Sequence, residues 1–282
     1  MAKAKTTEIQ KVAPSAVVVK PQINFGADAG AGMEGAGHEA FAIPFLAVLQ
    51  KMSPQVDEDD KAKFIPGAKP GMFIETVSGR LFDGKDGVRI VPCAYKRVFL
   101  RWSPRESGGA GFKGEISPSD IAEMRARNEV VEMDGRLYAP LEDGSVNQKR
   151  SDRFADTRLH FCLLLDEKTG ATQQVLLSMT STQIKKSKSL MSMLAGVKVE
   201  ATHGGMTTPA TFANVVKVTT LPESNDKGSW YGVRFELAGF VGGHDIYDAA
   251  KAFHASVIKG IVSARYEEED EHQPDRQNAS GF

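Results

Sequence analysis

The sequence has little of what marks several large classes of protein. Its 282 residues include two cysteines, Cys93 and Cys162, which are too few for a disulfide-stabilised scaffold and which both lie in apolar, strand-like runs. No apolar run approaches the roughly 18 residues that a membrane-spanning helix needs. The first residues also lack the long apolar centre of a signal peptide. We therefore expect a cytoplasmic protein with reduced thiols.

Motifs of catalysis are missing as well. The chain has no GxxxxGKS/T phosphate loop, no HExxH, no GxSxG and no GxGxxG that opens a helix. Its six histidines are scattered without the spacing of metal ligands. A polar, proline-containing segment follows the glycine-rich stretch 107–114, which favours a mobile loop over a phosphate cradle. We predict a protein that is not an enzyme and that has no metal site and no cofactor.

Neither sign of charge is in excess, because 35 Lys and Arg residues face 36 Asp and Glu residues. The sum excludes a uniformly basic DNA-coating protein, but it hides an asymmetry. Residues 267–282 carry a net charge of −5, so residues 1–266 carry +4. A mildly basic body with an acidic tail differs physically from a neutral protein, since the body alone attracts polyanions.

Composition divides the chain into three parts. Residues 1–37 are rich in Ala, Gly, Lys and Thr and contain GADAGAGMEGAG, which predicts a flexible N-terminal arm. Residues 38–265 have the apolar clusters of a single globular domain. Residues 266–282 cannot bury surface, so we predict a disordered acidic tail.

Strand patterns dominate the central part, so the fold class is expected to be mainly β with a few helices (α+β). Hairpins are predicted over 72–82 and over 130–140, where Asp134-Gly135 forms the turn. A short helix is expected after Pro44, over 44–52, and another over 120–128. A glycine-rich loop is expected over 103–115, and a last helix over about 245–265.

The core elements follow the order of an OB-like five-stranded barrel. The expected strands are 88–102, 157–167, 171–179, 210–221 and 229–241, and a helix over 181–195 comes between the third and the fourth. An insertion at about 103–156 separates the first two strands. OB barrels bind oligonucleotides and oligosaccharides.

One strand interleaves aromatic and basic residues. Alternate residues of a strand share a face, so Tyr95, Arg97, Phe99 and Arg101 lie on one side of it. Lys96 and Trp102 lie on the other. Single-stranded nucleic acid binds such surfaces, because bases stack on rings while cations follow the phosphates. The alternative is a core strand with buried aromatic rings and arginines that reach the solvent rim.

Two more basic clusters are candidates for phosphate contacts. Lys149, Arg150 and Arg153 form the first, and Lys185 and Lys186 on the 181–195 helix form the second. The alternative for the first cluster is an ordinary solvated loop, and the pattern of the second favours a solvated helix face over phosphate contacts.

Two resemblances add to these patterns. The acidic block Glu267, Glu268, Glu269, Asp270 and Glu271, with Phe282 at the end, resembles the tail of the single-stranded-DNA-binding proteins of bacteria and their phages. A neutral QNASG separates the two parts here. The runs 43–56, 70–112 and 176–190 resemble a family of phage-encoded proteins of replication genes. The first resemblance implies an OB-fold body and a tail that docks replication proteins and competes with DNA for the basic groove. The second implies single-stranded-DNA binding or an unassigned role among replication genes.

We therefore predict a phage-type single-stranded-DNA-binding protein that acts in DNA replication and recombination, without catalysis and without sequence preference, in the cytoplasm of the infected host. Its expected partners are single-stranded DNA and, through the tail, replication or recombination proteins, with homo-oligomers possible. A strand-annealing recombination protein is one alternative. A protein-interaction module or inhibitor of a host factor is the other.

Overall fold

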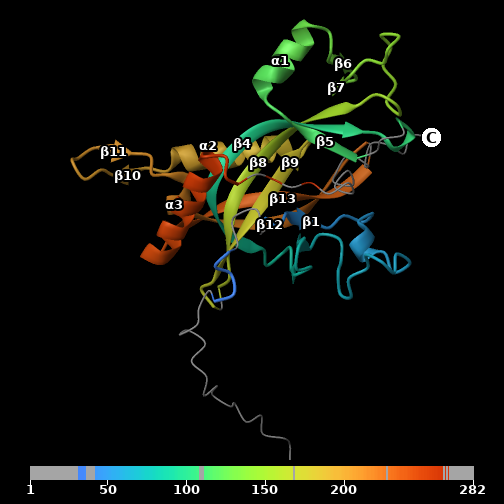
Figure 1. The fold of residues 1–282 in the computed structure, drawn as a ribbon. Coiled ribbons are helices and arrows are strands. Elements are labelled where there is room, and N and C mark those ends of the chain that lie inside the picture. Colours follow the sequence, from blue (N-terminus) through green and yellow to red (C-terminus); the bar gives the residue numbers. More distant parts are fainter. Residues whose placement is uncertain are drawn as a thin grey trace, which may run out of the picture. The chain divides into compact units, whose positions relative to one another are not determined.

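The structure is a computed structural model that describes residues 31–35, 42–107, 111–167, 169–226, 228–262, 264 and 266. The chain divides into two compact units, Met1–Ala40 and Phe41–Phe282. All helices and strands of the described residues belong to the second unit (Figure 1). The arm expected over 1–37, except for 31–35, and the tail expected over 266–282, except for Tyr266, lie outside the described residues.

Two long antiparallel strands form the centre of the second unit. β4 (Val88–Ser103) and β8 (Arg153–Leu165) pair from Arg89↔Leu165 to Trp102↔Arg153, with a register shift between Pro92 and Ala94. Pro92 lacks a backbone N–H, so it sits at this irregularity rather than in the regular ladder. Both strands are rich in the β-branched, aromatic and leucine side chains that pack on a half-buried sheet, which favours their length.

The remaining strands extend this pair on both sides. β9 (Thr172–Thr180) pairs with β8, while β12 (Asn214–Asn225) pairs with β4 and with β13 (Gly228–Phe240). The resulting sheet order is β9-β8-β4-β12-β13. The helix α2 (Gln183–Gly196) comes between β9 and β12, and α3 (His244–Ile258) follows β13. The five core strands and the helix between the third and fourth are thus found in the predicted order.

The fold class, mainly β with a few helices, is confirmed. A closed barrel would need a ladder between the two end strands, β9 and β13, and the described residues contain none. Instead, the segment 45–50 contacts both end strands, β9 and β13. Phe45 forms a parallel bridge with Leu176 of β9, and the Gln50 side chain bonds both backbone groups of Tyr231 in β13.

That segment corrects one sequence prediction. The helix expected over 44–52 is wrong, because Leu46–Val48 forms the strand β1 and pairs with β2 (Phe73–Glu75). β2 also pairs with β3 (Leu81–Phe82), as the predicted hairpin requires. Phe45, Leu46 and Leu49 are all buried in this arrangement. Side chains that satisfy a helical spacing are buried here by sheet pairing on both sides, so tertiary contacts override the local pattern.

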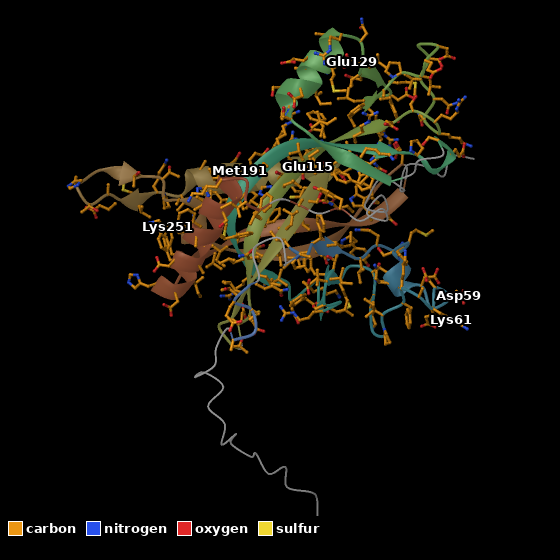
Figure 2. All side chains as sticks on the ribbon, viewed as in Figure 1. Asp59, Lys61, Glu115, Glu129, Met191 and Lys251 are labelled. Atoms are coloured by element: carbon orange, nitrogen blue, oxygen red, sulfur yellow. The ribbon has the colours of Figure 1, made fainter. Side chains whose placement is uncertain are left out.

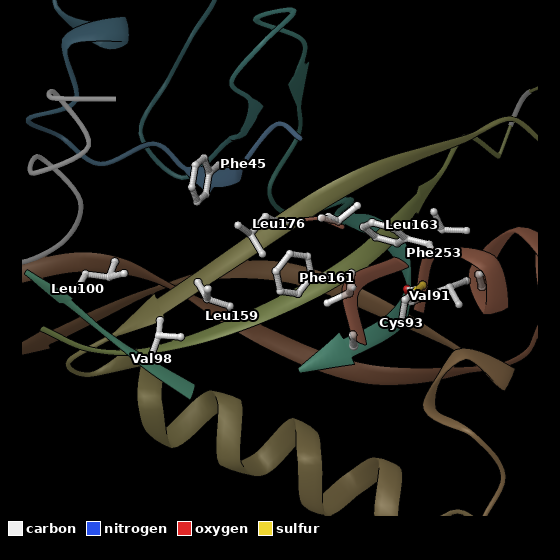
Figure 3. Packing of buried hydrophobic residues seen from close by; sticks show 14 of the residues in the cluster. Phe45, Val91, Cys93, Val98, Leu100, Leu159, Phe161, Leu163, Leu176 and Phe253 are labelled. Carbon is white, nitrogen blue, oxygen red and sulfur yellow. Dashed lines mark hydrogen bonds between the residues drawn. The ribbon is translucent and has the colours of Figure 1, made fainter. Parts of the chain in front are cut away.

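The sheet is buried on both faces. On one face, Phe161, Leu163 and Leu176 pack with Phe253 of α3 and with Phe45 (Figure 3). On the other, Ile90, Cys162 and Val216 pack with Leu190 and Leu194 of α2. Both cysteines are free and buried, and burial raises the pKa of the Cys93 thiol to about 12. Neither thiol is therefore poised to react.

A lobe covers one end of the β4–β8 pair and continues the same sheet through a hairpin that pairs with β8 (Figure 1). It comprises α1 (Pro118–Ala126), capped by Ser117, and the hairpin of β6 (Val131–Met133) and β7 (Arg136–Tyr138). Asp134-Gly135 forms the hairpin turn as predicted, with φ of 53° and 73°. The loop expected over 103–115 is wrong in its second half, because β5 (Gly111–Ile116) pairs with the end of β4.

The short hairpin of β10 (Val199–Glu200) and β11 (Met206–Thr207) completes the elements, with 3-10 turns at Pro54–Val56, Arg105–Ser107 and Thr211–Ala213. Among the described residues, no helix combines the length and apolar character that a bilayer crossing requires.

Candidate nucleic-acid interface

The candidate interface lies on one face of β4 and β8, between α2 and the α1 lobe. Tyr95, the first of its residues, is 38% exposed, and its ring centroid lies 5.2 Å from that of His160 on β8. His160 is buried and shares a 2.7 Å hydrogen bond with Ser187 of α2. Tyr95 therefore stands beside the point where α2 docks on the sheet, with its ring open to solvent.

Arg97 follows Tyr95 on the same face, held by a carboxylate from the neighbouring strand. Its Nε and Nη2 donate to the two oxygens of Asp156 at 3.1 Å and 3.0 Å. Arg158, whose side chain is only 8% exposed, donates to the same carboxylate. Burial raises the pKa of Asp156, but the hydrogen bonds and charges of the two arginines outweigh it and lower the pKa.

Arg101 continues the row two residues beyond Phe99. Its Nε donates to Asp152 at 2.6 Å, and its guanidinium carbon lies 5.7 Å from the ring centroid of Phe154. Asp152 also accepts a hydrogen bond from Ser103. On this face, the three guanidiniums of Arg97, Arg101 and Arg158 therefore meet two carboxylates.

The basic loop before β8 adjoins this end of the row. The backbone N–H groups of Arg150 and Ser151 donate to the Asn147 carbonyl at 3.0 Å and 2.7 Å, which fixes the turn. Lys149 is exposed and lies 3.9 Å from Glu106. Arg150 is exposed too, whereas Arg153 begins β8 and pairs with Trp102 in the ladder. Lys149 and Arg150 therefore lie in the loop that leads to Asp152, the partner of Arg101, but Arg153 shares the Trp102 face of the sheet and does not extend the arginine row.

Two of the aromatic residues expected to stack on bases are in the core. Phe99 is 5% exposed and packs with Ile121 and Phe154 under the α1 lobe. Trp102 is also 5% exposed and lies 5.4 Å from the ring of Phe112. The alternation of faces is correct, but the α1 lobe covers Phe99 on one face of β4 and Phe112 packs against Trp102 on the other. Neither ring is available to a base, so those two assignments are wrong.

Lys96 lies on the opposite face from the arginines. Its Nζ is 5.5 Å from the ring centroid of Phe161, and its charge acts on Glu115 of β5. Burial raises the pKa of Glu115, while Lys96 opposes that shift. Glu115, in β5, is labelled in Figure 2. Lys96 therefore belongs to the sheet's other side and does not extend the arginine row.

The two candidate lysines of α2 differ from each other. Lys185 is exposed, whereas Lys186 is half-buried and bonds Glu223 of β12 at 2.6 Å. Glu223 in turn accepts a 3.0 Å hydrogen bond from the Trp230 indole. Lys186 thus ties α2 to the sheet, and Lys185 keeps an accessible charge.

The acidic partners of the arginine row were missed from the sequence. Asp152 immediately precedes β8, and Asp156 and Arg158 stand at alternate positions within it, so Asp156 and Arg158 share a face of the strand. Opposite charges at alternate positions of two strands are the signal of cross-strand ion pairs, and it becomes readable once the strands are known to pair.

The described residues contain no group of three or more His, Cys, Asp or Glu side chains that could hold a metal ion. The candidate interface consists of a row of arginine guanidiniums beside the exposed ring of Tyr95. Guanidinium forks match the oxygens of phosphate as well as those of carboxylate.

A family model described as Pam3 phage gp34-like protein matches residues 13–263, which is most of the chain. No curated protein and no solved structure matches significantly.

Proposed function

The chain belongs to the Pam3 phage gp34-like family, and from that premise we propose that it binds single-stranded DNA during phage DNA replication or recombination. The binding is independent of sequence and involves no catalysis. Backbone phosphates contact the cations, and a base stacks on an exposed ring.

The observation that carries the proposal is the neighbouring exposure of Tyr95 and Arg97 on the face of β4. A ring that is open to solvent gives a base a stacking partner worth about 1–3 kcal/mol. A guanidinium fork beside it gives the adjacent phosphate a partner. Arg101 and the loop cations Lys149 and Arg150 continue the positive charge toward the α1 end.

The carboxylates of Asp152 and Asp156 act as internal counterions for this row. They hold the guanidiniums of Arg97 and Arg101 in place while no ligand is bound. A phosphate that replaces either carboxylate binds a guanidinium that is already correctly oriented. It must, however, compete with that carboxylate for the guanidinium. The proposal therefore requires affinity that is modest and strongly dependent on salt.

The tail supplies a second competitor. Residues 267–282 carry −5 against +4 for the rest of the chain, so the tail is a polyanion tethered to a basic body. We infer that Glu267–Glu271 and Phe282 dock replication or recombination proteins and compete with DNA. Removing the tail should tighten binding.

A fluorescence-anisotropy titration of a labelled oligo-dT tests the proposal directly. The full chain and a chain that ends at Tyr266 are compared at low salt and at physiological salt, with a duplex of equal length as the control ligand. We expect binding of the single strand in preference to the duplex, and tighter binding after truncation. Absence of binding by both chains at low salt would refute the proposal.

A further inference from the structure

The second half of β13 is exposed to an extent unusual for a strand of the main sheet. All five residues from Glu236 to Phe240 are exposed, including Leu237 at 43% and Phe240 at 54%. One edge of β13 pairs with β12. No strand among the described ranges pairs with its other edge.

The first half of that edge is already covered. Gln50 accepts a hydrogen bond from the backbone N–H of Tyr231 at 2.8 Å and donates to its carbonyl at 2.9 Å. The backbone groups of Tyr231 therefore point away from β12. Because these directions alternate along an antiparallel strand, the groups of Val233, Phe235 and Leu237 point to the same edge.

Natural edge strands are usually blunted by lysine, proline or a covering segment. The stretch from Gly232 to Leu237 contains neither lysine nor proline, and the irregularity of the β12–β13 ladder comes after it, at Ala238. It does contain Arg234 and Glu236, an exposed pair at 3.2 Å on one face of the strand. An open apolar edge with this charge pattern is a template for another strand.

The geometry points to a second copy of this chain as that other strand. In an antiparallel β13–β13 pairing about a two-fold axis at Phe235, Arg234 of each chain faces Glu236 of the other. Val233 faces Leu237 in the same pairing. Shifting the axis to Glu236 would place two glutamates opposite each other, which is unfavourable. The strand is thus self-complementary in charge in one register, as an isologous interface requires.

The pairing adds four backbone hydrogen bonds or more and covers Leu237. It is short, so the dimer should be weak and dependent on concentration. It does not rest on DNA binding, because β13 carries none of the residues assigned to the DNA interface.

Sedimentation velocity on the full chain without DNA, over a range of protein concentrations, tests the proposal. We expect reversible dimers. The charge reversals Arg234→Glu and Glu236→Arg should each weaken dimerisation by about tenfold or more, since each places like charges across both halves of the interface. Arg125→Glu, which breaks a similarly exposed pair with Glu132, is the matched control and should change nothing.

An equimolar mixture of the two reversed chains provides the decisive result. Mixed dimers again have opposite charges across the axis, so the mixture should associate more tightly than either variant alone. The intrachain pair cannot explain such a rescue, because each chain still carries two like charges. A chain that stays monomeric, or dimers that respond equally to all three substitutions, would overturn the proposal, as would a mixture without rescue.

Discussion

Asp156 on β8 accepts two hydrogen bonds from the guanidinium of Arg97 on β4, at 3.1 Å and 3.0 Å. The same carboxylate serves the nearly buried Arg158. One carboxylate thus pairs with two arginines at the centre of the proposed DNA interface and leaves one positive charge uncompensated. Asp156 therefore affects two properties: the stability of the sheet and the availability of the Arg97 guanidinium to a phosphate.

Replacing Asp156 with Asn should tighten DNA binding and weaken the fold. Loss of the carboxylate leaves the exposed Arg97 free to contact phosphate, so we expect about tenfold higher affinity at low salt and a steeper salt dependence. The nearly buried Arg158 loses its partner, which should cost about 2–3 kcal/mol of unfolding free energy. Anisotropy with oligo-dT and urea unfolding measure the two effects.

Glu167→Gln is the control, because Glu167 pairs with Arg89 at the opposite end of β4 and β8. If both substitutions raised the affinity equally, the effect would be one of net charge alone.

Stability should fall with acid between about pH 6.5 and pH 4 because of His160. Burial, assisted by the charge of Arg158, lowers the pKa of His160 from 6.5 to about 4. The unfolded chain therefore binds this proton first as the pH falls. The neutral imidazole contributes stability that is fully present above pH 6.5 and is lost toward pH 4, at most about 3 kcal/mol.

His160→Gln keeps a partner for Ser187 and removes this titration. Unfolding free energies measured between pH 4 and pH 7 should then vary less with pH than those of the parent chain. Equal pH dependence of the two chains would show that His160 is not responsible.

Substitution by leucine should have different effects at the exposed and at the buried aromatic residues of β4. Tyr95→Leu should lower DNA affinity about tenfold, from the loss of base stacking, and should change stability little. Trp102→Leu should lower the unfolding free energy by about 2–4 kcal/mol and leave the affinity of the folded protein within about twofold. A loss of affinity in the Trp102 variant alone would reverse the assignment.

A close backbone approach near the start of β4 predicts a strongly destabilising substitution. A Cβ added at Gly84 would lie 1.8 Å from the Gly71 carbonyl oxygen and 2.1 Å from the Thr220 hydroxyl. Gly84→Ala should therefore lower the free energy of unfolding by about 1–3 kcal/mol or more. A lower melting temperature measures this effect. Gly196→Ala is the control, since nothing lies within 4 Å of its Cβ position, and it should be neutral or slightly stabilising.

The order of the core was predictable because each of its elements has a strong local signal. Alternating or continuous apolar runs predict β4, β8, β9, β12 and β13, and the 3.6-residue spacing in 245–265 predicts α3. β1 was not predictable, because its apolar residues fit a helix equally well. Pairing with β2 and β9, which are distant in sequence, determines that these residues form a strand.

The candidate site was predictable in part for the same reason. Alternation placed Tyr95, Arg97 and Arg101 on one face. It did not reveal that the α1 lobe covers Phe99, or that Trp102 packs with Phe112 and Tyr266, since those contacts come from the inserted lobe and from the chain beyond α3. Exposure along a strand depends on what covers it, and local sequence does not encode that.

The salt dependence of oligo-dT affinity tests the central claim most directly. The logarithm of the binding constant is measured against the logarithm of salt concentration for the parent chain, Arg97→Gln, Arg101→Gln and the control Arg89→Gln. Removing one cation that neutralises a phosphate of single-stranded DNA should reduce the slope by about 0.7. We predict that reduction for Arg97→Gln and Arg101→Gln and an unchanged slope for Arg89→Gln. Equal slopes in all four proteins, or no binding in any, would contradict the account.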